Sequence, residues 1–321
     1  MAKVPKTMRA AAIDRFGPAS VLKLHELPVP AVGAREVLIA LDTVGVGSWD
    51  ADIRAGWWPS GKPRFPLVLG TDGAGTIAAV GSRVRSLRVG QRAYAYEFTN
   101  RKGGFYAGYV AVRAEKAARI PRALETKRAG AITVTGLTAL QGVDDALRLK
   151  RGETVLIHGA GGGVGTLAVQ FARWRGARVL ATATGRDGVA LARRLGAHAA
   201  VDGKRGDIAA AARRFAPEGV DAVLAFAGGP SLTRCLDTLK PGGRVVYPNG
   251  VEPPPRKRKG VRIEAYDAIS GVAEFRRLNR AIEAAKPKVV IDSVYLLADA
   301  AEAHRRLARG HVLGKVVLRI R

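Results

Sequence analysis

Residues 154–172 read TVLIHGAGGGVGTLAVQFA, an apolar run followed by a glycine-rich turn and a helical pattern. The run predicts a buried strand over 154–158, and the pattern predicts a helix over 164–174. Ala160, Gly162 and Gly165 stand at the three positions of the G-x-G-x-x-G fingerprint, with alanine at the first. Small residues there keep the turn tight, let the backbone approach a pyrophosphate and let the helix pack closely on the strand. The stretch therefore predicts a dinucleotide site formed by Ala160, Gly162, Gly163, Val164 and Gly165.

The chain after this turn alternates between short apolar runs and helical patterns. Further strands are predicted over residues 178–183, 199–201, 222–226 and 244–247. Helices are predicted between them, over residues 188–195, 207–215 and 231–239. Alternation at this spacing predicts an α/β fold of the Rossmann type, a doubly wound parallel sheet with helices on both faces.

The end of the second strand bears on the choice of dinucleotide. An NAD site usually carries an acidic residue there, which accepts a hydrogen bond from the ribose 2′-hydroxyl. Here Thr184 and Arg186 follow the strand, and no carboxylate precedes Asp187. An arginine holds a 2′-phosphate that a carboxylate would repel. We therefore predict NADPH, with Thr184 and Arg186 at the adenosine phosphate; the alternative is that Arg186 is an ordinary surface charge.

The chain before the turn has a different pattern. Short strands bounded by Gly, Pro or Asp, without helices between them, are predicted to begin near residues 8, 36, 73, 91 and 108. Many short strands in succession predict a compact, partly open barrel. A helix is predicted over 125–147, and the end of the chain offers a strand over 289–291, a helix over 297–309 and a strand over 316–320.

The composition is that of a soluble globular protein with a strong positive charge. The 321 residues suggest about two domains. Lysine and arginine number 53 against 27 acidic residues, a net charge of +26 that attracts polyanions such as nucleic acid. The basic residues are scattered except for the run RKRK at 256–259, and aromatic residues make up only 6%. This distribution favours a solvated surface over a nucleic-acid site.

The sequence also bears on the compartment. It has no apolar stretch of about 18 residues and no signal-peptide core near its N-terminus. The single cysteine, Cys235, cannot form an internal disulfide and is expected in the core. We expect a cytoplasmic protein that does not associate with membranes.

Several segments, taken in this order and spacing, resemble the zinc-free quinone oxidoreductases, relatives of zeta-crystallin in the medium-chain dehydrogenase/reductase superfamily. They are MRAAAIDRFG (8–17), PLVLGTDGAGTIAAVGSRV (66–84), GLTAL (136–140), VLIHGAGGGVGTLAVQ (155–170), LARRLGA (191–197) and GHVLGKVVLRI (310–320). The resemblance implies a mostly β, GroES-like catalytic domain made of residues 1–124 and 261–321, with the return placed between 260 and 288. Residues 125–260 would form the Rossmann NADP-binding domain, with the nicotinamide in a cleft between the two. The resemblance also implies a homodimer.

Two positions depart from the wider superfamily. Zinc-dependent relatives place a cysteine where Gly47 stands and a histidine where Thr71 stands. Catalytic zinc needs three protein ligands and an open position, so we predict no metal site. The zinc-free relatives commonly carry an asparagine at the Gly47 position and a tyrosine near Asp52, and this departure bears on the substrate rather than the cofactor.

The resemblance also implies further cofactor contacts. Thr138 is expected near the nicotinamide carboxamide. The loops after the later Rossmann strands are expected to flank the nicotinamide half, through Phe226, Ala227, Gly228, Tyr247, Asn249 and Gly250.

Without a metal, hydride transfer is easiest to a conjugated acceptor whose π-system spreads the developing charge. Donors near the acceptor oxygen still help, and the candidates are Ser48, Trp49, Asp50 and Thr71. Trp57 and Trp58 would form an apolar wall for a flat ring, or simply pack on the domain, and Tyr94 is a further substrate candidate.

We therefore predict an NADPH-dependent, zinc-independent reductase of quinones or similar conjugated carbonyls. One alternative is an enone, alkenal or enoyl-thioester reductase on the same scaffold. A second alternative is a basic RNA-binding protein that retains a vestigial NADPH site, with the RKRK loop carrying the binding.

Overall fold

The computed structural model describes residues 4–58 and 61–321. Its contacts divide the chain into two compact units. The first comprises Met1–Val134, Ser270–Glu283 and Ile291–Arg321, and the second comprises Thr135–Ile269 and Ala284–Val290. Within the described ranges, no helix combines the length and the apolar character needed to span a bilayer.

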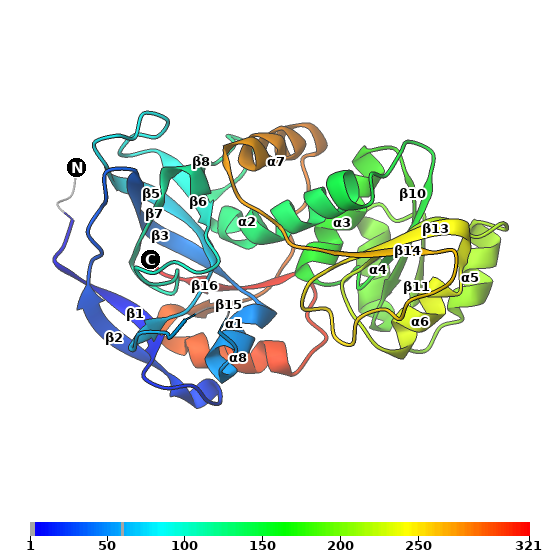
Figure 1. Ribbon diagram of the computed structural model, residues 1–321, viewed down its shortest axis with the longest axis horizontal. Helices are drawn as coiled ribbons and strands as arrows, with labels where there is room; N and C mark the ends of the chain where they lie inside the picture. The colour runs from blue at the N-terminus through cyan, green and yellow to red at the C-terminus, as the bar shows by residue number, and fades with distance from the viewer. Residues whose placement is uncertain (1–3, 59–60) are drawn as a thin grey trace. The chain divides into compact units, whose positions relative to one another are not determined.

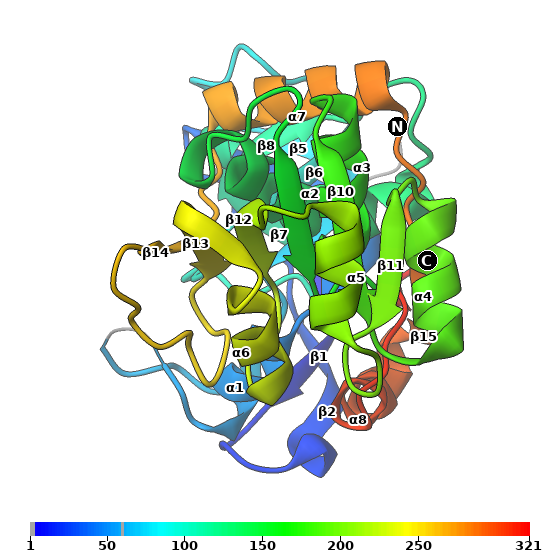
Figure 2. The ribbon, with the colours of Figure 1, turned by 90° about the vertical axis from the view of Figure 1, so that its right-hand side faces the viewer.

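The second unit is built on a six-stranded sheet in which every neighbouring pair of strands is parallel (Figure 2). The strand order is β11-β10-β9-β12-β13-β14. The strands are β9 (Thr154–His158), β10 (Arg178–Ala183), β11 (Ala199–Asp202), β12 (Val220–Ala225), β13 (Leu239–Pro248) and β14 (Arg262–Tyr266). Order and direction confirm the predicted doubly wound α/β sheet.

Four helices connect these strands: α3 (Gly163–Trp174), α4 (Gly185–Arg194), α5 (Ile208–Phe215) and α6 (Pro230–Leu236). The helices α3 and α4 connect β9 to β10 and β10 to β11, toward one edge of the sheet. The helices α5 and α6 connect β11 to β12 and β12 to β13, in the opposite direction. Right-handed crossovers place these two pairs on opposite faces. Apolar residues of α5 and α6 pack together against the sheet, and Ile208, Leu232 and Leu236 are all buried there.

The first unit is mostly β (Figure 1). Its larger sheet contains β3 (Glu36–Val46), β5 (Asp72–Val80), β6 (Arg92–Tyr96), β7 (Tyr109–Arg113), β8 (Ala117–Arg119), β15 (Ile291–Leu296) and β16 (Lys315–Arg319). A three-stranded sheet joins β2 (Leu22–Pro28), β1 (Thr7–Ile13) and β4 (Leu67–Val68). One hydrophobic core lies under both sheets. Because β16 pairs with β3, the C-terminal segment belongs to the same sheet as residues near the start of the chain.

The remaining helices are α1 (Ser48–Ala55), α2 (Thr126–Gln141), α7 (Val272–Ala285) and α8 (Ala300–Ala308). The sequence patterns above do not predict five of the elements: α1, α7, β2, β4 and β14. The strand predicted over 289–291 instead begins at Ile291 and runs to Leu296. The prediction is too early in the chain because it rested on three consecutive apolar residues. The strand that pairs with β16 is half-exposed and begins at the last of them.

Candidate functional site

The glycine-rich turn between β9 and α3 has one glycine that the fold requires and one that it does not. A Cβ atom on Gly165 would lie 2.1 Å from the carbonyl oxygen of Gly159 and 2.8 Å from Cα of Ala160. Gly162, the residue before the first turn of α3, would bring its Cβ no closer than 3.7 Å to the same oxygen. Gly165 therefore permits close packing of helix and turn, and Gly162 keeps open space at the helix N-terminus. A helix N-terminus favours the negative charge of a pyrophosphate, and binding of one at this turn stays a prediction.

The other predicted cofactor positions gather at the same edge of the sheet, because the strands are parallel and in register at their carboxyl ends. His158 pairs with Thr182 of β10 and with Ala225 of β12. The backbone N–H of Phe226 donates to the carbonyl of His158, so the loop that follows β12 lies against the glycine-rich turn. The residues that follow these strands are Thr184, Arg186, Phe226, Ala227, Gly228, Asn249 and Gly250, with Tyr247 near the end of β13. Their contacts with a cofactor stay a prediction.

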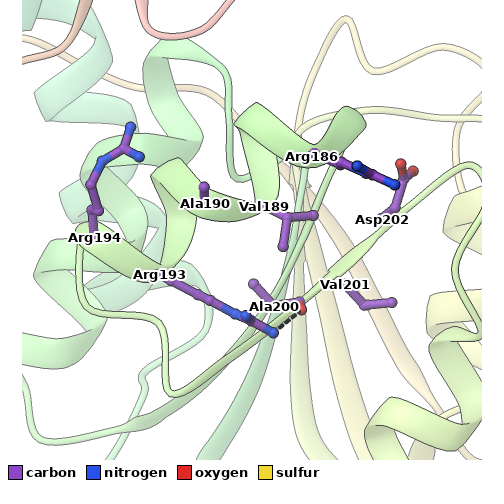
Figure 3. A pocket seen from close by; sticks show the side chains of 8 residues that line it. All are labelled: Arg186, Val189, Ala190, Arg193, Arg194, Ala200, Val201 and Asp202. Carbon is purple, nitrogen blue, oxygen red and sulfur yellow. Dashed lines mark hydrogen bonds between the residues drawn. The ribbon is translucent and has the colours of Figure 1, made fainter.

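Arg186 lies in the first turn of α4, which begins at Gly185 rather than at the predicted residue 188. It is exposed at one end of a pocket of about 570 Å³ between α4 and β11 (Figure 3). Asp202, at the end of β11, lies beside it in the same pocket.

Asp202 is the residue that sequence reasoning missed at this end of the sheet. Its carboxylate accepts hydrogen bonds from the backbone N–H groups of Gly185, Lys204 and Arg205, which lowers its pKa below the usual range of an aspartate. The acid follows the third strand instead of the second, so a search at the second strand cannot find it. It ties the loop after β11 to the start of α4, and thereby to the Arg186 turn.

Two of the carried-over positions already have partners within the second unit. The side-chain amide of Asn249 donates to Asp267 at 2.8 Å. The hydroxyl of Tyr266 donates to the carbonyl of Thr138 at 2.9 Å, so β14 fixes this part of α2. Both residues are held in place before any ligand binds.

The four candidate catalytic residues lie together in the first unit, but they differ in exposure. Ser48 is exposed at the start of α1, and Trp49 is half-buried next to it. The indole N–H of Trp49 donates to the hydroxyl of Thr71 at 2.9 Å, and Thr71 is only 1% exposed. Ser48 is therefore the most exposed of the four candidates. An indole has one N–H and Thr71 accepts it here, so the expectation that Trp49 donates to a substrate stays a prediction.

Asp50 is buried, and its carboxyl group forms hydrogen bonds at the start of α1. Its Oδ2 accepts from the backbone N–H of Gly47 at 2.8 Å and from the hydroxyl of Tyr106 at 3.0 Å. Burial raises the pKa of Asp50 to about 7, the largest influence, while the Gly47 hydrogen bond and the charge of Lys315 act in the opposite direction. Asp50 is only 1% exposed, and its expected role as a donor to the acceptor stays a prediction.

The hydrogen bonds continue from Asp50 to a buried histidine. Tyr106 lies 3.3 Å from Nε2 of His304, and Nδ1 of His304 lies 2.9 Å from a guanidinium nitrogen of Arg54. Arg54 can only donate, so Nδ1 accepts and Nε2 carries the proton toward Tyr106. Burial, assisted by the Arg54 charge, lowers the pKa of His304 to about 3, and the ring is neutral at physiological pH.

Asp50→Asn is expected to change how stability depends on pH. The folded-state pKa of about 7 lies above the ordinary value of 3.8, so between these pH values the unfolded chain loses the proton first. Stability contributed by protonated Asp50 is therefore lost as pH rises through this window, by up to roughly 4 kcal/mol. The free energy of unfolding of the variant minus that of the wild type should rise from about pH 4 to about pH 7. Urea unfolding at several pH values measures this difference, and a level curve would contradict the buried acid.

The three substrate candidates occupy different environments. Trp57 is 53% exposed and its ring lies 6.0 Å from that of Phe98, whereas Trp58 is half-buried and packs on the core. Tyr94 is fully buried, with its ring 5.2 Å from Phe275 of α7 and its hydroxyl donating to Asn279. Its hydroxyl already has a partner within the first unit, and a contact of Tyr94 with substrate stays a prediction.

Phe98 is the aromatic residue that sequence reasoning missed. The backbone N–H of Glu97 donates to the carbonyl of Thr71 at 2.9 Å, so the segment that carries Phe98 runs next to Thr71. Trp49 also contacts Thr71, through its side chain. The exposed parts of Trp49 and of the Trp57–Phe98 pair thus lie around one short segment, which a linear search for motifs does not show.

Comparison with known proteins places the chain. A family model for the alcohol dehydrogenase GroES-like domain matches residues 33–122, and one described as zinc-binding dehydrogenase matches residues 195–318. The quinone oxidoreductase of Lama guanicoe is 33% identical over 331 residues, and the match covers 99% of each chain. The chain belongs to the quinone oxidoreductase family. It is an oxidoreductase of the medium-chain dehydrogenase/reductase superfamily, as its sequence motifs predict.

Solved structures of family members agree with the fold. The Escherichia coli quinone oxidoreductase complexed with NADPH is 25% identical, with a TM-score of 0.86 over 97% of this chain and 100% of that one. An NAD-dependent alcohol dehydrogenase is 30% identical, with a TM-score of 0.90 over 98% and 100%. The shared fold therefore carries either dinucleotide, and the choice depends on local residues.

Zinc, which one family model names, does not fit the residues at the two ligand positions. Gly47 offers no side chain, and a Cβ there would lie 2.4 Å from the Trp49 ring, which occupies the space. At the other position the Thr71 hydroxyl accepts from that ring. Among the described residues, no three His, Cys, Asp or Glu side chains are arranged to hold a metal ion.

Proposed function

We propose that this protein is an NADPH-dependent reductase that transfers hydride to a quinone or a similar conjugated carbonyl without a catalytic metal. The observation that carries the proposal is the turn at Gly162, the residue before α3, where an added Cβ would lie no closer than 3.7 Å to the Gly159 carbonyl oxygen. Full-length similarity to quinone oxidoreductases supports the acceptor class. The residues at positions 47 and 71 support a reaction without zinc, because Gly47 has no side chain to bind a metal and the Thr71 hydroxyl accepts a hydrogen bond from Trp49.

The second unit would bind the nucleotide by parts that the structure defines. The backbone around Gly162, Gly163 and Val164 would hold the pyrophosphate at the N-terminus of α3. Thr184 and Arg186 would hold the adenosine phosphate at the start of α4, a turn that Asp202 fixes. When bound, the nicotinamide ring supplies the hydride.

The residues of the first unit would orient the acceptor. Trp49, anchored on Thr71, and the Trp57–Phe98 pair would form the walls against which a flat ring packs. Ser48, exposed at the start of α1, would donate a hydrogen bond to the oxygen that gains negative charge. A conjugated acceptor spreads that charge over its own π-system, so one donor suffices where an isolated carbonyl would need a metal.

Arg186→Ala is expected to weaken NADPH binding by about 10- to 100-fold, because a hydrogen bond between charged groups contributes about 1.5–3 kcal/mol. NADH, which lacks the 2′-phosphate, should bind the variant and the wild type equally. Nucleotide fluorescence titrations measure both affinities.

Arg194→Ala is the matched control, because Arg194 is an exposed arginine of the same helix that lines the same pocket, but its side chain is directed away from Asp202 (Figure 3). Equal loss of NADPH affinity in both variants would indicate a general charge effect and contradict the assigned phosphate contact. Steady-state assays with quinones and with unsaturated ketones or aldehydes then test the acceptor class. If the protein reduced neither quinones nor unsaturated ketones or aldehydes, the proposed function would be refuted.

A further inference from the structure

Lys315, the first residue of β16, is a buried cation. It is 6% exposed, and its ammonium lies 4.9 Å from the centroid of the Trp49 ring. Burying an ammonium is costly unless opposite charges or an aromatic face compensate for the lost water. Groups next to this lysine must therefore compensate for the burial of its charge.

Two buried carboxylates lie near this cation. Asp50 of α1 and Asp72 of β5 are each 1% exposed, and each has one oxygen, Oδ1, without a hydrogen-bond partner among the described residues. Burial raises the pKa of both acids, and the charge of Lys315 acts in the opposite direction. A Cβ on Gly45 would lie 2.8 Å from both Oδ1 of Asp72 and Cε of Lys315, so these two side chains converge on the backbone of β3.

The same cation limits where the Trp49 ring can lie. The ring is so close to Gly47 that a Cβ there would lie 2.4 Å from Cε2 of Trp49. Its N–H is anchored on Thr71 at 2.9 Å. The Lys315 ammonium adds a third restraint through a cation–π contact, which is stronger when the cation is desolvated.

We propose that Lys315 is a positioning residue that holds the Trp49 ring in place at the acceptor site, with Asp72 next to the lysine side chain at Gly45. The inference rests on the proposed function for its effect on turnover, but the restraint on Trp49 does not depend on it. The side chains of Lys315 from β16 and Asp72 from β5 lie together at the backbone of β3, with the Trp49 ring next to the ammonium. The lysine never contacts the acceptor and acts through Trp49.

Lys315→Met removes the charge and keeps most of the side-chain volume. The value of kcat/KM for a quinone is expected to fall by about 100-fold, because a displacement of about 1 Å in a positioning group can cost that much. NADPH affinity should be unchanged, since the nucleotide turn lies in the other unit. Lys315→Arg, which keeps the charge and the cation–π contact, should recover much of the activity.

A second readout is independent of turnover. In a background where Trp57, Trp58 and Trp174 are replaced by phenylalanine, Trp49 is the remaining indole emitter. Lys315→Met should shift its emission to the red and make it more accessible to a neutral quencher, and Lys315→Arg should restore both. If Lys315→Met does not fold, the pair Lys315→Met/Asp72→Asn removes both buried charges and allows the same measurements.

Lys23→Met, at an exposed lysine of β2 in the same unit, is the matched control. Emission and kcat/KM of Lys315→Met equal to those of this control would overturn the proposal. Loss of NADPH affinity in Lys315→Met would also contradict it, because the role is confined to Trp49. If the emission shifts as expected but the wild type reduces no conjugated acceptor, the proposed function fails while the positioning role stands.

Discussion

Gly165→Ala is expected to abolish nucleotide binding and to destabilise the second unit. A Cβ at this position would lie 2.1 Å from the Gly159 carbonyl oxygen, and the atoms it meets are backbone atoms of the turn that cannot rotate away. Alanine is otherwise favoured over glycine within a helix by about 1 kcal/mol, so any loss must come from this contact. Overpacking of this kind costs about 1–3 kcal/mol or more. Thermal unfolding and NADPH titration measure the two effects.

Gly162→Ala is the matched comparison in the same turn. Its Cβ would meet no protein atom closer than 3.7 Å, so the fold should tolerate it. The added methyl group would occupy the space in front of the helix N-terminus, and NADPH affinity should fall while the unfolding temperature stays near that of the wild type. If Gly162→Ala bound NADPH as the wild type does, the pyrophosphate would not lie at this turn.

This turn and its sheet are predictable from the sequence because their signals are local. The strand Thr154–His158 and the strand Arg178–Ala183 match the predicted ranges to the residue. Each contains three consecutive apolar residues, Val155–Ile157 and Val179–Ala181, as expected for strands of a parallel sheet covered on both faces. Helix α4 begins three residues earlier than predicted, because its first turn is polar and lacks the apolar periodicity of the remainder.

The first unit is less predictable, because its site depends on long-range contacts. Helix α1 buries only Asp50 and Ile53, so its sequence shows no apolar stripe. Tyr94 lies in a strand with an exposed appearance, GQRAYAYEF, but helix α7, nearly 200 residues later, covers it through Phe275. Lys315 reaches Trp49 only because β16 pairs with β3. Pairings of this kind leave no periodic signal in either segment.

Gly47→Asn is expected to reduce activity strongly, although the resemblance to the zinc-free quinone oxidoreductases implies an asparagine at this position. The backbone of Gly47 is extended, at φ −111° and ψ 162°, and asparagine is a favourable residue before a helix. The obstacle is Trp49, since a Cβ on residue 47 would lie 2.4 to 2.9 Å from three atoms of its ring. Displacing the ring would break its hydrogen bond to Thr71, and kcat/KM should fall by about 100-fold.

Gly47→Asn/Trp49→Ala separates the clash from the asparagine itself. Removing the ring gives the new side chain room, so the second substitution should cost much less in the Gly47→Asn background than in the wild type, a coupling that a double-mutant cycle measures. Gly108→Ala is the control, because its Cβ would approach its nearest neighbour, Cβ of Met8, only to 3.4 Å, an ordinary contact. If the two substitutions were additive, the Trp49 ring would not occupy the space that a side chain at position 47 needs. Coupling would instead mean that glycine at 47 and tryptophan at 49 depend on each other, because the ring fills the space next to the glycine.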